Sequence, residues 1–125
     1  LVVHGSDGLD EITTTGKTYI SEFDGTNIFS YDFDPLECGI PISKGEQLLG
    51  GDIKKNVSIV WDILGGKKSP ARDIVVLNAA FALYIAEKVS NISEGIELAK
   101  EAIDLGKAKN KLEQLIKFTN KNFNE

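Results

Sequence analysis

The chain has 125 residues, 42% hydrophobic and 26% charged, with a formal net charge of −5 from 19 acidic and 14 basic side chains. This composition is typical of one soluble globular domain and argues against intrinsic disorder, and the acidic balance argues against tight binding to nucleic acid. A lone cysteine, Cys38, rules out an internal disulfide and indicates a cytoplasmic protein, and no apolar run approaches the roughly 20 residues needed to span a membrane.

Residues 1–4 are an apolar run that opens the chain, and the sequence contains no methionine. The run lacks alternation, which predicts a strand covered on both faces, as in a parallel α/β sheet. Because the chain starts directly on such a strand, we expect it to be part of a longer polypeptide. Residues 5–15 are rich in Gly, Asp and Thr and predict a loop.

Two β-rich segments follow, at residues 17–23 and 27–33, on either side of Asp24-Gly25. Asp-Gly between two such segments predicts an antiparallel hairpin. Asp34-Pro35 then ends the sheet pattern, because proline disfavours a sheet interior and restricts the residue before it.

From residue 43 onward the apolar period becomes helical. Ser43 begins a Ser-x-x-Glu capping box, which predicts a short helix through residue 49. Asp52 is the expected N-cap of a second helix that ends at Gly65-Gly66. The apolar stripe of this helix is predicted to comprise Val57, Val60, Trp61 and Leu64.

Ser69-Pro70 predicts the start of a third helix, which we expect to run to about Val89. This segment is apolar nearly all round, so the helix should lie in the middle of the protein. Ser93 is the expected cap of a helix that extends through Leu105, and residues 108–118 predict the last helix. The stripe of that last helix is predicted to comprise Leu112, Leu115, Ile116 and Phe118.

The densest functional signal is the loop at residues 5–11, which carries three carboxylates, Asp7, Asp10 and Glu11, just after a strand. Ligands of open α/β sheets gather beyond the carboxyl ends of the strands. Mg²⁺ prefers oxygen ligands and is often held by one or two carboxylates together with substrate phosphates. The residues alone leave two interpretations open, a metal site or an acidic turn in which Asp7 bonds local backbone amides.

Other polar or reactive residues are interpreted as structural. His4 has no identifiable partner, which favours a structural role over that of a general base. Arg72 is expected to form a structural ion pair rather than bind phosphate, and Asn78 to bond to a neighbouring loop. Cys38 and Trp61 are expected to be packing residues.

Several segments, in order along the chain, resemble the anthranilate phosphoribosyltransferase family. They are Val2-Val3-His4-Gly5-Ser6-Asp7-Gly8-Leu9-Asp10-Glu11 with Thr13-Thr14-Thr15-Gly16, Gly50-Gly51-Asp52 with Asn56, Ile63-Leu64-Gly65-Gly66, Arg72-Asp73 with Val76-Leu77-Asn78-Ala79-Ala80, and Glu94-Gly95-Ile96 with Ala99 and Ile103-Asp104. Each segment is weak evidence by itself, but together they cover residues 2 to about 115.

The resemblance implies the nucleoside phosphorylase/phosphoribosyltransferase fold of glycosyltransferase family 3. We therefore expect residues 1–125 to be the C-terminal part of a single α/β catalytic domain, a short strand and a β-hairpin followed by a helical region. The N-terminal helical domain and the first half of the α/β domain are not in this sequence. The family transfers the phosphoribosyl group of phosphoribosyl pyrophosphate to the amine of anthranilate, releasing pyrophosphate, in tryptophan biosynthesis.

The resemblance also implies that Asp10 and Glu11 coordinate Mg²⁺ on the pyrophosphate, with Asp7 either supporting this pair or capping the turn. The family's phosphate loop, its Lys-His-Gly-Asn stretch and its anthranilate-contacting arginine have no match here, so the substrate-binding residues are expected upstream. We expect the isolated chain to be inactive or nearly so without its N-terminal portion. The family commonly forms homodimers, and neither nucleic acid nor a membrane is an expected partner.

Two alternatives remain. The chain could belong to a related enzyme resembling the nucleoside phosphorylases, although these handle free phosphate and do not depend on an acidic pair such as Asp10-Glu11. It could also be a non-catalytic module of the same fold that binds a polyphosphate or a protein.

Overall fold

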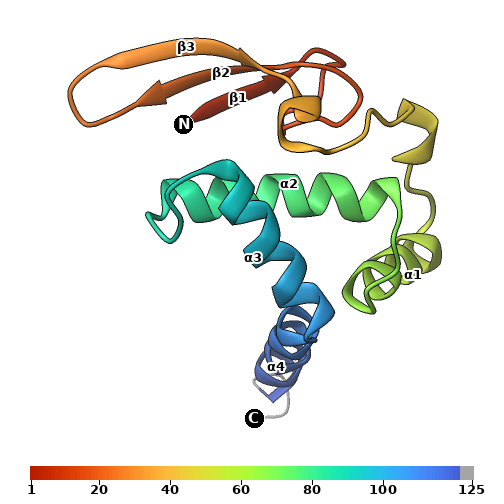
Figure 1. Ribbon diagram of the computed structural model, residues 1–125. Coiled ribbons are helices and arrows are strands. Elements are labelled where there is room, and N and C mark those ends of the chain that lie inside the picture. Colours follow the sequence, from red (N-terminus) through yellow and green to blue (C-terminus); the bar gives the residue numbers. More distant parts are fainter. Residues whose placement is uncertain (122–125) are drawn as a thin grey trace.

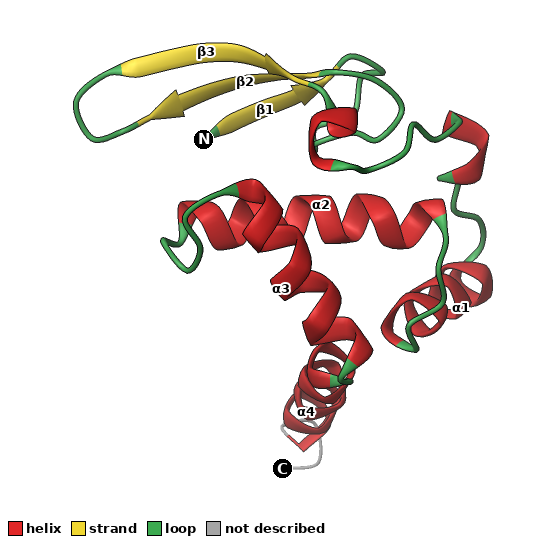
Figure 2. Cartoon of the chain, in the orientation of Figure 1, coloured by secondary structure: helices red, strands yellow, loops and turns green. Residues whose placement is uncertain are grey.

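The computed structural model describes residues 1–121, in which a small sheet is followed by helices (Figure 1, Figure 2). The strands of these residues are β1 (Val2–Gly5), β2 (Thr18–Phe23) and β3 (Ile28–Phe33). Two short 3-10 helices follow, η1 (Pro35–Cys38) and η2 (Gly45–Gln47), and then the α-helices α1 (Ile53–Leu64), α2 (Pro70–Ile85), α3 (Ile92–Asp104) and α4 (Lys107–Lys121). No helix among the described residues is long and apolar enough to cross a membrane.

The sheet has the order β1-β2-β3, and both neighbouring pairs are antiparallel. The predicted hairpin is confirmed: β2 and β3 pair with Tyr19 opposite Asp32. The carboxylate of Asp24 closes the turn by accepting hydrogen bonds from the backbone amides of Thr26 and Asn27, at 2.8 and 2.7 Å. A side chain that bonds the backbone two or three residues ahead holds such a turn without help from the rest of the protein.

The first strand lies where the sequence predicted it, but the prediction that both of its faces are covered in a parallel sheet was wrong. β1 pairs antiparallel with β2 rather than lying in a parallel sheet, and the side chain of Val2 is 73% exposed. An apolar run this short cannot show alternation even when one face is open, because alternation is visible only over several residues.

Helix α2 lies between the sheet and the other helices (Figure 1). This confirms the prediction of a central helix, and its core-facing residues are Val76, Leu77, Ala80 and Phe81. The ring of Phe81 meets that of Phe33 edge to face, with centroids 4.9 Å apart and planes at 84°, which joins the helix to β3. The helix ends at Ile85 rather than near Val89, because Glu87 takes a left-handed conformation with φ 54°.

Helix α3 crosses α2 at close range at Gly95. A Cβ atom on Gly95 would lie 2.8 Å from the carbonyl oxygen of Ala80 and 3.0 Å from its Cα, so the backbones approach only because the side chain is absent. At the other end of the contact, Arg72 of α2 forms an ion pair with Asp104 of α3 at 2.7 Å.

The predicted caps of α1 and α2 are confirmed, since Asp52 accepts from the amide of Lys55 and Ser69 from that of Arg72. Two other cap predictions were wrong. The amide of Ser43 donates to the carbonyl of Thr14, and only the three-residue helix η2 follows. Helix α3 is capped by Asn91 rather than Ser93, and either residue type suits an N-cap, so the sequence does not distinguish them.

The apolar stripe predicted for α1 was largely wrong. The helix turns Ile63 and Ile59 inward, and Leu64 is half-buried, whereas Val57 and Val60 are exposed and Trp61 is 37% exposed. Trp61 is therefore not a core residue of the described chain. In α4 only Leu112 of the predicted stripe is half-buried, and Leu115, Ile116 and Phe118 are exposed.

Candidate metal-binding loop

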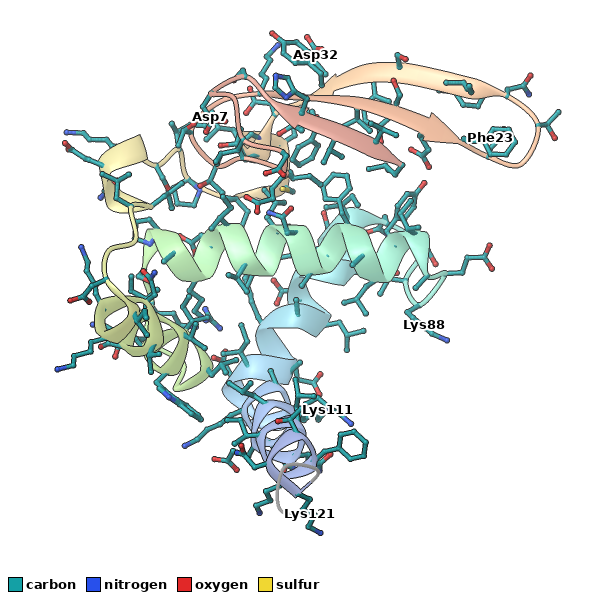
Figure 3. The ribbon with its side chains drawn as sticks, turned by 180° about the vertical axis from the view of Figure 1, so that it is seen from behind. Asp7, Phe23, Asp32, Lys88, Lys111 and Lys121 are labelled. Atoms are coloured by element: carbon teal, nitrogen blue, oxygen red, sulfur yellow. The ribbon has the colours of Figure 1, made fainter. Side chains whose placement is uncertain are left out.

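The acidic residues lie in the loop that connects β1 to β2, at the opposite end of the sheet from Phe23 (Figure 3). The loop turns back on itself directly after β1. The amide of Gly5 donates to the carbonyl of Leu9 at 2.8 Å, and the amide of Gly8 donates to the carbonyl of Gly5 at 2.9 Å. The chain is thus folded tightly before Asp10 and Glu11 are reached.

Asp7 stabilises this loop from within. One carboxylate oxygen accepts from the hydroxyls of Thr13 and Thr15, at 2.6 and 2.5 Å, and the other accepts from the amide of Leu9 at 3.1 Å. Burial raises the pKa of Asp7, but the hydrogen bonds outweigh it and the net pKa lies below the ordinary value of 3.8. Asp7 therefore bonds local groups of the turn, which was one of the two interpretations that the sequence left open.

Gly5 is required by the packing around Asp7. A Cβ atom at this position would lie 2.5 Å from Oδ1 of Asp7 and 3.2 Å from Cβ of Thr13. Oδ1 is the oxygen that accepts from the amide of Leu9, so a side chain at position 5 would displace an atom that holds the loop.

Asp10 and Glu11 are exposed like Asp7, but they differ from it in their hydrogen bonding. Within residues 1–121, neither carboxylate accepts a hydrogen bond or forms an ion pair, so all four oxygens are free to bind a cation. No group of three or more His, Cys, Asp or Glu side chains in this part of the chain could hold a metal alone. A hard cation bound here would need further oxygen ligands from water or from a substrate, as is common for Mg²⁺.

The loop is anchored on its other side by α2. The side-chain amide of Asn78 accepts a hydrogen bond from the backbone amide of Ile12 at 3.0 Å and donates one to the carbonyl of Ile12 at 2.8 Å. This confirms the prediction that Asn78 bonds to a neighbouring loop. Ile12 is only 2% exposed and directly follows Glu11.

Two hollows in the surface are relevant to the choice of site. One, of about 470 Å³, lies beside the acidic loop and is lined by Glu11, Leu48, Ile59 and Ile74 among others. The larger one, of about 740 Å³, lies between the hairpin turn and the end of α2.

The larger hollow contains the carboxylate of Glu22, a contact that the sequence did not indicate. Its two oxygens accept hydrogen bonds from the hydroxyls of Tyr31 and Tyr84, at 2.9 and 3.1 Å, and the bond to Glu22 raises the pKa of Tyr84. Both oxygens of this carboxylate already accept hydrogen bonds that join the sheet to α2. The acidic loop is therefore the candidate site.

Comparison with known proteins decides the family. The family model described as "Glycosyl transferase family, a/b domain" matches residues 1–109. The chain belongs to this family.

The family's relatives confirm the resemblance found in the sequence. The chain is 48% identical, over 96% of its length, to the anthranilate phosphoribosyltransferase of Acetivibrio thermocellus, and spans 35% of that protein. The anthranilate phosphoribosyltransferase structure from Thermus thermophilus matches with a TM-score of 0.83 and 32% identity, over 93% of this chain and 34% of that one. The chain thus spans about a third of the relatives it matches, and the predicted α/β class is confirmed.

A further match is the anthranilate phosphoribosyltransferase from Saccharomyces cerevisiae in complex with phosphoribosyl pyrophosphate and Mg. It has a TM-score of 0.79 and 28% identity, and the match covers 89% of this chain and 32% of that one. The family comparison therefore includes a protein in which both the donor substrate and the metal are present.

The remaining candidate residues of this family member make contacts within the fold. His4 is exposed and stacks on Tyr19 of the neighbouring strand, with ring centroids 6.3 Å apart. The predicted structural ion pair of Arg72 is confirmed by its contact with Asp104. Cys38 is half-buried, its Sγ donates to the carbonyl of Pro35, and burial raises its pKa.

Proposed function

We propose that the chain is part of an enzyme that transfers the phosphoribosyl group of phosphoribosyl pyrophosphate to the amine of anthranilate. In this reaction the bond from the amine nitrogen to the anomeric carbon forms, the bond from that carbon to pyrophosphate breaks, and the nitrogen loses a proton. Asp10 and Glu11 hold the Mg²⁺ ion that accompanies the pyrophosphate. The observation that carries the proposal is the pair of adjacent carboxylates that have no partner within residues 1–121, on a loop held by hydrogen bonds on both sides of them.

The donor chemistry of the loop fits magnesium. Carboxylate oxygens are its preferred protein ligands, and two of them leave room for water and phosphate oxygens. Bound Mg²⁺ would neutralise the charge that develops on the leaving pyrophosphate and fix its orientation. The Saccharomyces cerevisiae structure with phosphoribosyl pyrophosphate and Mg supports both the metal and the donor substrate.

Asp7 has a supporting role in this proposal. Its three hydrogen bonds, which also lower its pKa, hold the start of the loop. It is therefore available to order the loop but less available than its neighbours as a metal ligand. A pre-ordered loop loses less conformational entropy when the ligand binds.

The proposal also assigns this chain a place in a larger protein. Residues 1–125 are the C-terminal part of a single α/β catalytic domain, and the groups that bind anthranilate and most of phosphoribosyl pyrophosphate lie in the remaining part. The share of the relatives that the chain spans, about 35%, supports this assignment. The complete protein is a homodimer in this proposal, as is common in the family, and acts in tryptophan biosynthesis.

The test is an assay of the complete protein with phosphoribosyl pyrophosphate and Mg²⁺, followed by the loss of anthranilate fluorescence. The complete protein should consume anthranilate, and residues 1–125 alone should not. The double variant Asp10→Asn with Glu11→Gln should lose at least roughly a hundredfold in rate, because it removes both metal-binding charges.

The matched control is Glu97→Gln with Glu113→Gln, which removes the same number of charges from exposed positions on α3 and α4. It should retain full activity. Binding of phosphoribosyl pyrophosphate without consumption of anthranilate would contradict the acceptor assignment and favour a related transferase or a non-catalytic module. Equal rates in the two double variants would contradict the metal role of the loop.

A further inference from the structure

One side chain of α2 holds the acidic loop at the residue that directly follows Asp10 and Glu11. The amide oxygen of Asn78 accepts from the backbone amide of Ile12, and its amide nitrogen donates to the carbonyl of Ile12. The same nitrogen donates to the carbonyl of Ile74, one turn earlier in α2, at 2.9 Å. Asn78 is half-buried, and three hydrogen bonds fix its orientation relative to the helix.

The loop is therefore pinned on both sides of Asp10 and Glu11. On the upstream side, Leu9 is held through its amide by Asp7 and through its carbonyl by the amide of Gly5. On the downstream side, both polar backbone groups of Ile12 are bonded to Asn78. These two anchors leave only the two carboxylate-bearing residues between them.

The two anchors differ in what they attach the loop to. At Leu9, the bond to Asp7 is made within the loop, and the bond from the amide of Gly5 ties the loop to the end of β1. The bonds at Ile12 are made to a side chain 66 residues away, on the central helix. Asn78 therefore fixes the acidic pair relative to the central helix, as the amide of Gly5 fixes it relative to the sheet.

We propose that Asn78 is a positioning residue that aligns Asp10 and Glu11 for Mg²⁺ without touching the ion. This inference rests on the proposed function, because it takes the two carboxylates to be the metal ligands. Side chains that orient metal ligands act by fixing the ligands before the metal arrives, and their loss commonly weakens metal binding by roughly 10-fold to 100-fold.

The variant that tests this is Asn78→Asp in the complete protein. It keeps the shape of the side chain and an acceptor for the Ile12 amide, but it places an oxygen opposite the carbonyls of Ile12 and Ile74. The Mg²⁺ concentration that gives half-maximal binding of inorganic pyrophosphate should rise by roughly tenfold. The maximal rate at saturating Mg²⁺ should change much less, since the ligands themselves are intact.

A second variant guards against loss of folding. Asn78→Ser retains a hydroxyl that can bond to the carbonyl of Ile74 but cannot reach Ile12. Hydrogen exchange at the amide of Ile12 should become faster in Asn78→Ser, and the Mg²⁺ requirement should rise in parallel. The exchange rate reports the broken contact independently of catalysis.

The matched control is Asn56→Asp. Asn56 spans Gly51 in the same way, accepting from its amide at 2.8 Å and donating to its carbonyl at 3.1 Å, but it holds the loop before α1. This variant should lower thermal stability without changing the Mg²⁺ requirement. A purely structural role for Asn78 would make the two aspartate variants behave alike.

The outcomes separate the two proposals. If wild-type protein binds pyrophosphate with Mg²⁺ and Asn78→Asp and Asn78→Ser have the same Mg²⁺ requirement, the positioning role is wrong and the metal role stands. If wild-type protein shows no Mg²⁺-dependent pyrophosphate binding, the metal role of the loop is wrong, and the positioning role is overturned with it.

Discussion

At the scale of single residues, three carboxylates within five positions of the sequence occupy two kinds of environment. Asp7 accepts three hydrogen bonds from its own loop, whereas Asp10 and Glu11 accept none from residues 1–121. The sequence predicted the acidic loop and its position after a strand. Only the family resemblance separated Asp10 and Glu11 from Asp7; the residues by themselves could not, because Thr13 and Thr15 meet Asp7 only after the loop has folded back on Gly5.

This difference predicts unequal losses of stability for the same substitution at two nearby positions. Asp7→Asn should lower the free energy of unfolding by about 1 kcal/mol at pH 7, since it weakens hydrogen bonds to a charged acceptor. Asp10→Asn, at a side chain without intramolecular partners, should change it by less than about 0.5 kcal/mol. Urea unfolding of the wild type and both variants measures these differences, and an Asp10→Asn variant as unstable as Asp7→Asn would contradict the assignment.

The destabilisation caused by Asp7→Asn should depend on pH. Because the folded state holds the pKa of Asp7 below 3.8, its charge contributes stability that is fully present above that value. The contribution is lost as the pH falls through the lowered pKa, where the folded protein also takes up the proton. The gap between wild type and Asp7→Asn should therefore be constant near neutral pH and close below about pH 4. If the difference in the free energy of unfolding persisted in acid, the contribution of Asp7 would depend on the shape of its side chain rather than on its charge.

At the scale of elements, local signals in the sequence predicted positions well and contacts less well. The turn at Asp24-Gly25 and the caps Asp52 and Ser69 act on backbone groups a few residues away, so their effect is contained in the sequence near them. The inward face of α1 is set by where α2, α3 and α4 lie. Two apolar stripes run side by side on that helix, and the sequence favoured the one that turned out to be exposed.

The ion pair between α2 and α3 is a tertiary contact whose strength depends on burial. The side chain of Arg72 is 2% exposed, so Asp104→Asn would leave a buried cation without its counter-charge. We expect a loss of about 2 to 3 kcal/mol in the free energy of unfolding, less than for a fully buried pair because Asp104 is 46% exposed.

The control for this prediction is Asp62→Asn, which breaks the pair with Lys67. Both partners of that pair are well exposed, at 48% and 63%, so the loss should stay below about 1 kcal/mol. Thermal unfolding of the two variants under the same conditions measures the difference. Equal losses would show that burial of Arg72 does not decide the strength of the contact.

At the scale of the whole molecule, the sheet and the helices form two layers that meet over only part of the sheet. Phe33, at the end of β3, is buried against Phe81 of α2, while Phe29 on the same strand is 53% exposed. Phe23, at the turn end of the hairpin, is likewise 62% exposed (Figure 3). The sequence predicted both layers, but the extent of their overlap depends on the packing of α2 and cannot be read from the strands alone.

The joint between the two layers can be tested by one substitution at two positions of β3. Phe33→Ala should lower the free energy of unfolding by about 3 to 5 kcal/mol, because it leaves a cavity in the core and removes the edge-to-face contact with Phe81. Phe29→Ala, with the same change four residues earlier, should cost less than about 1 kcal/mol because its ring already contacts water. Urea unfolding measures both losses of free energy, and the ratio of the loss at Phe33 to the loss at Phe29 matters more than either value. A large loss at Phe29 would mean that the far end of the hairpin is part of the cooperative core, and the two layers would then be coupled along the whole length of the sheet rather than at Phe33.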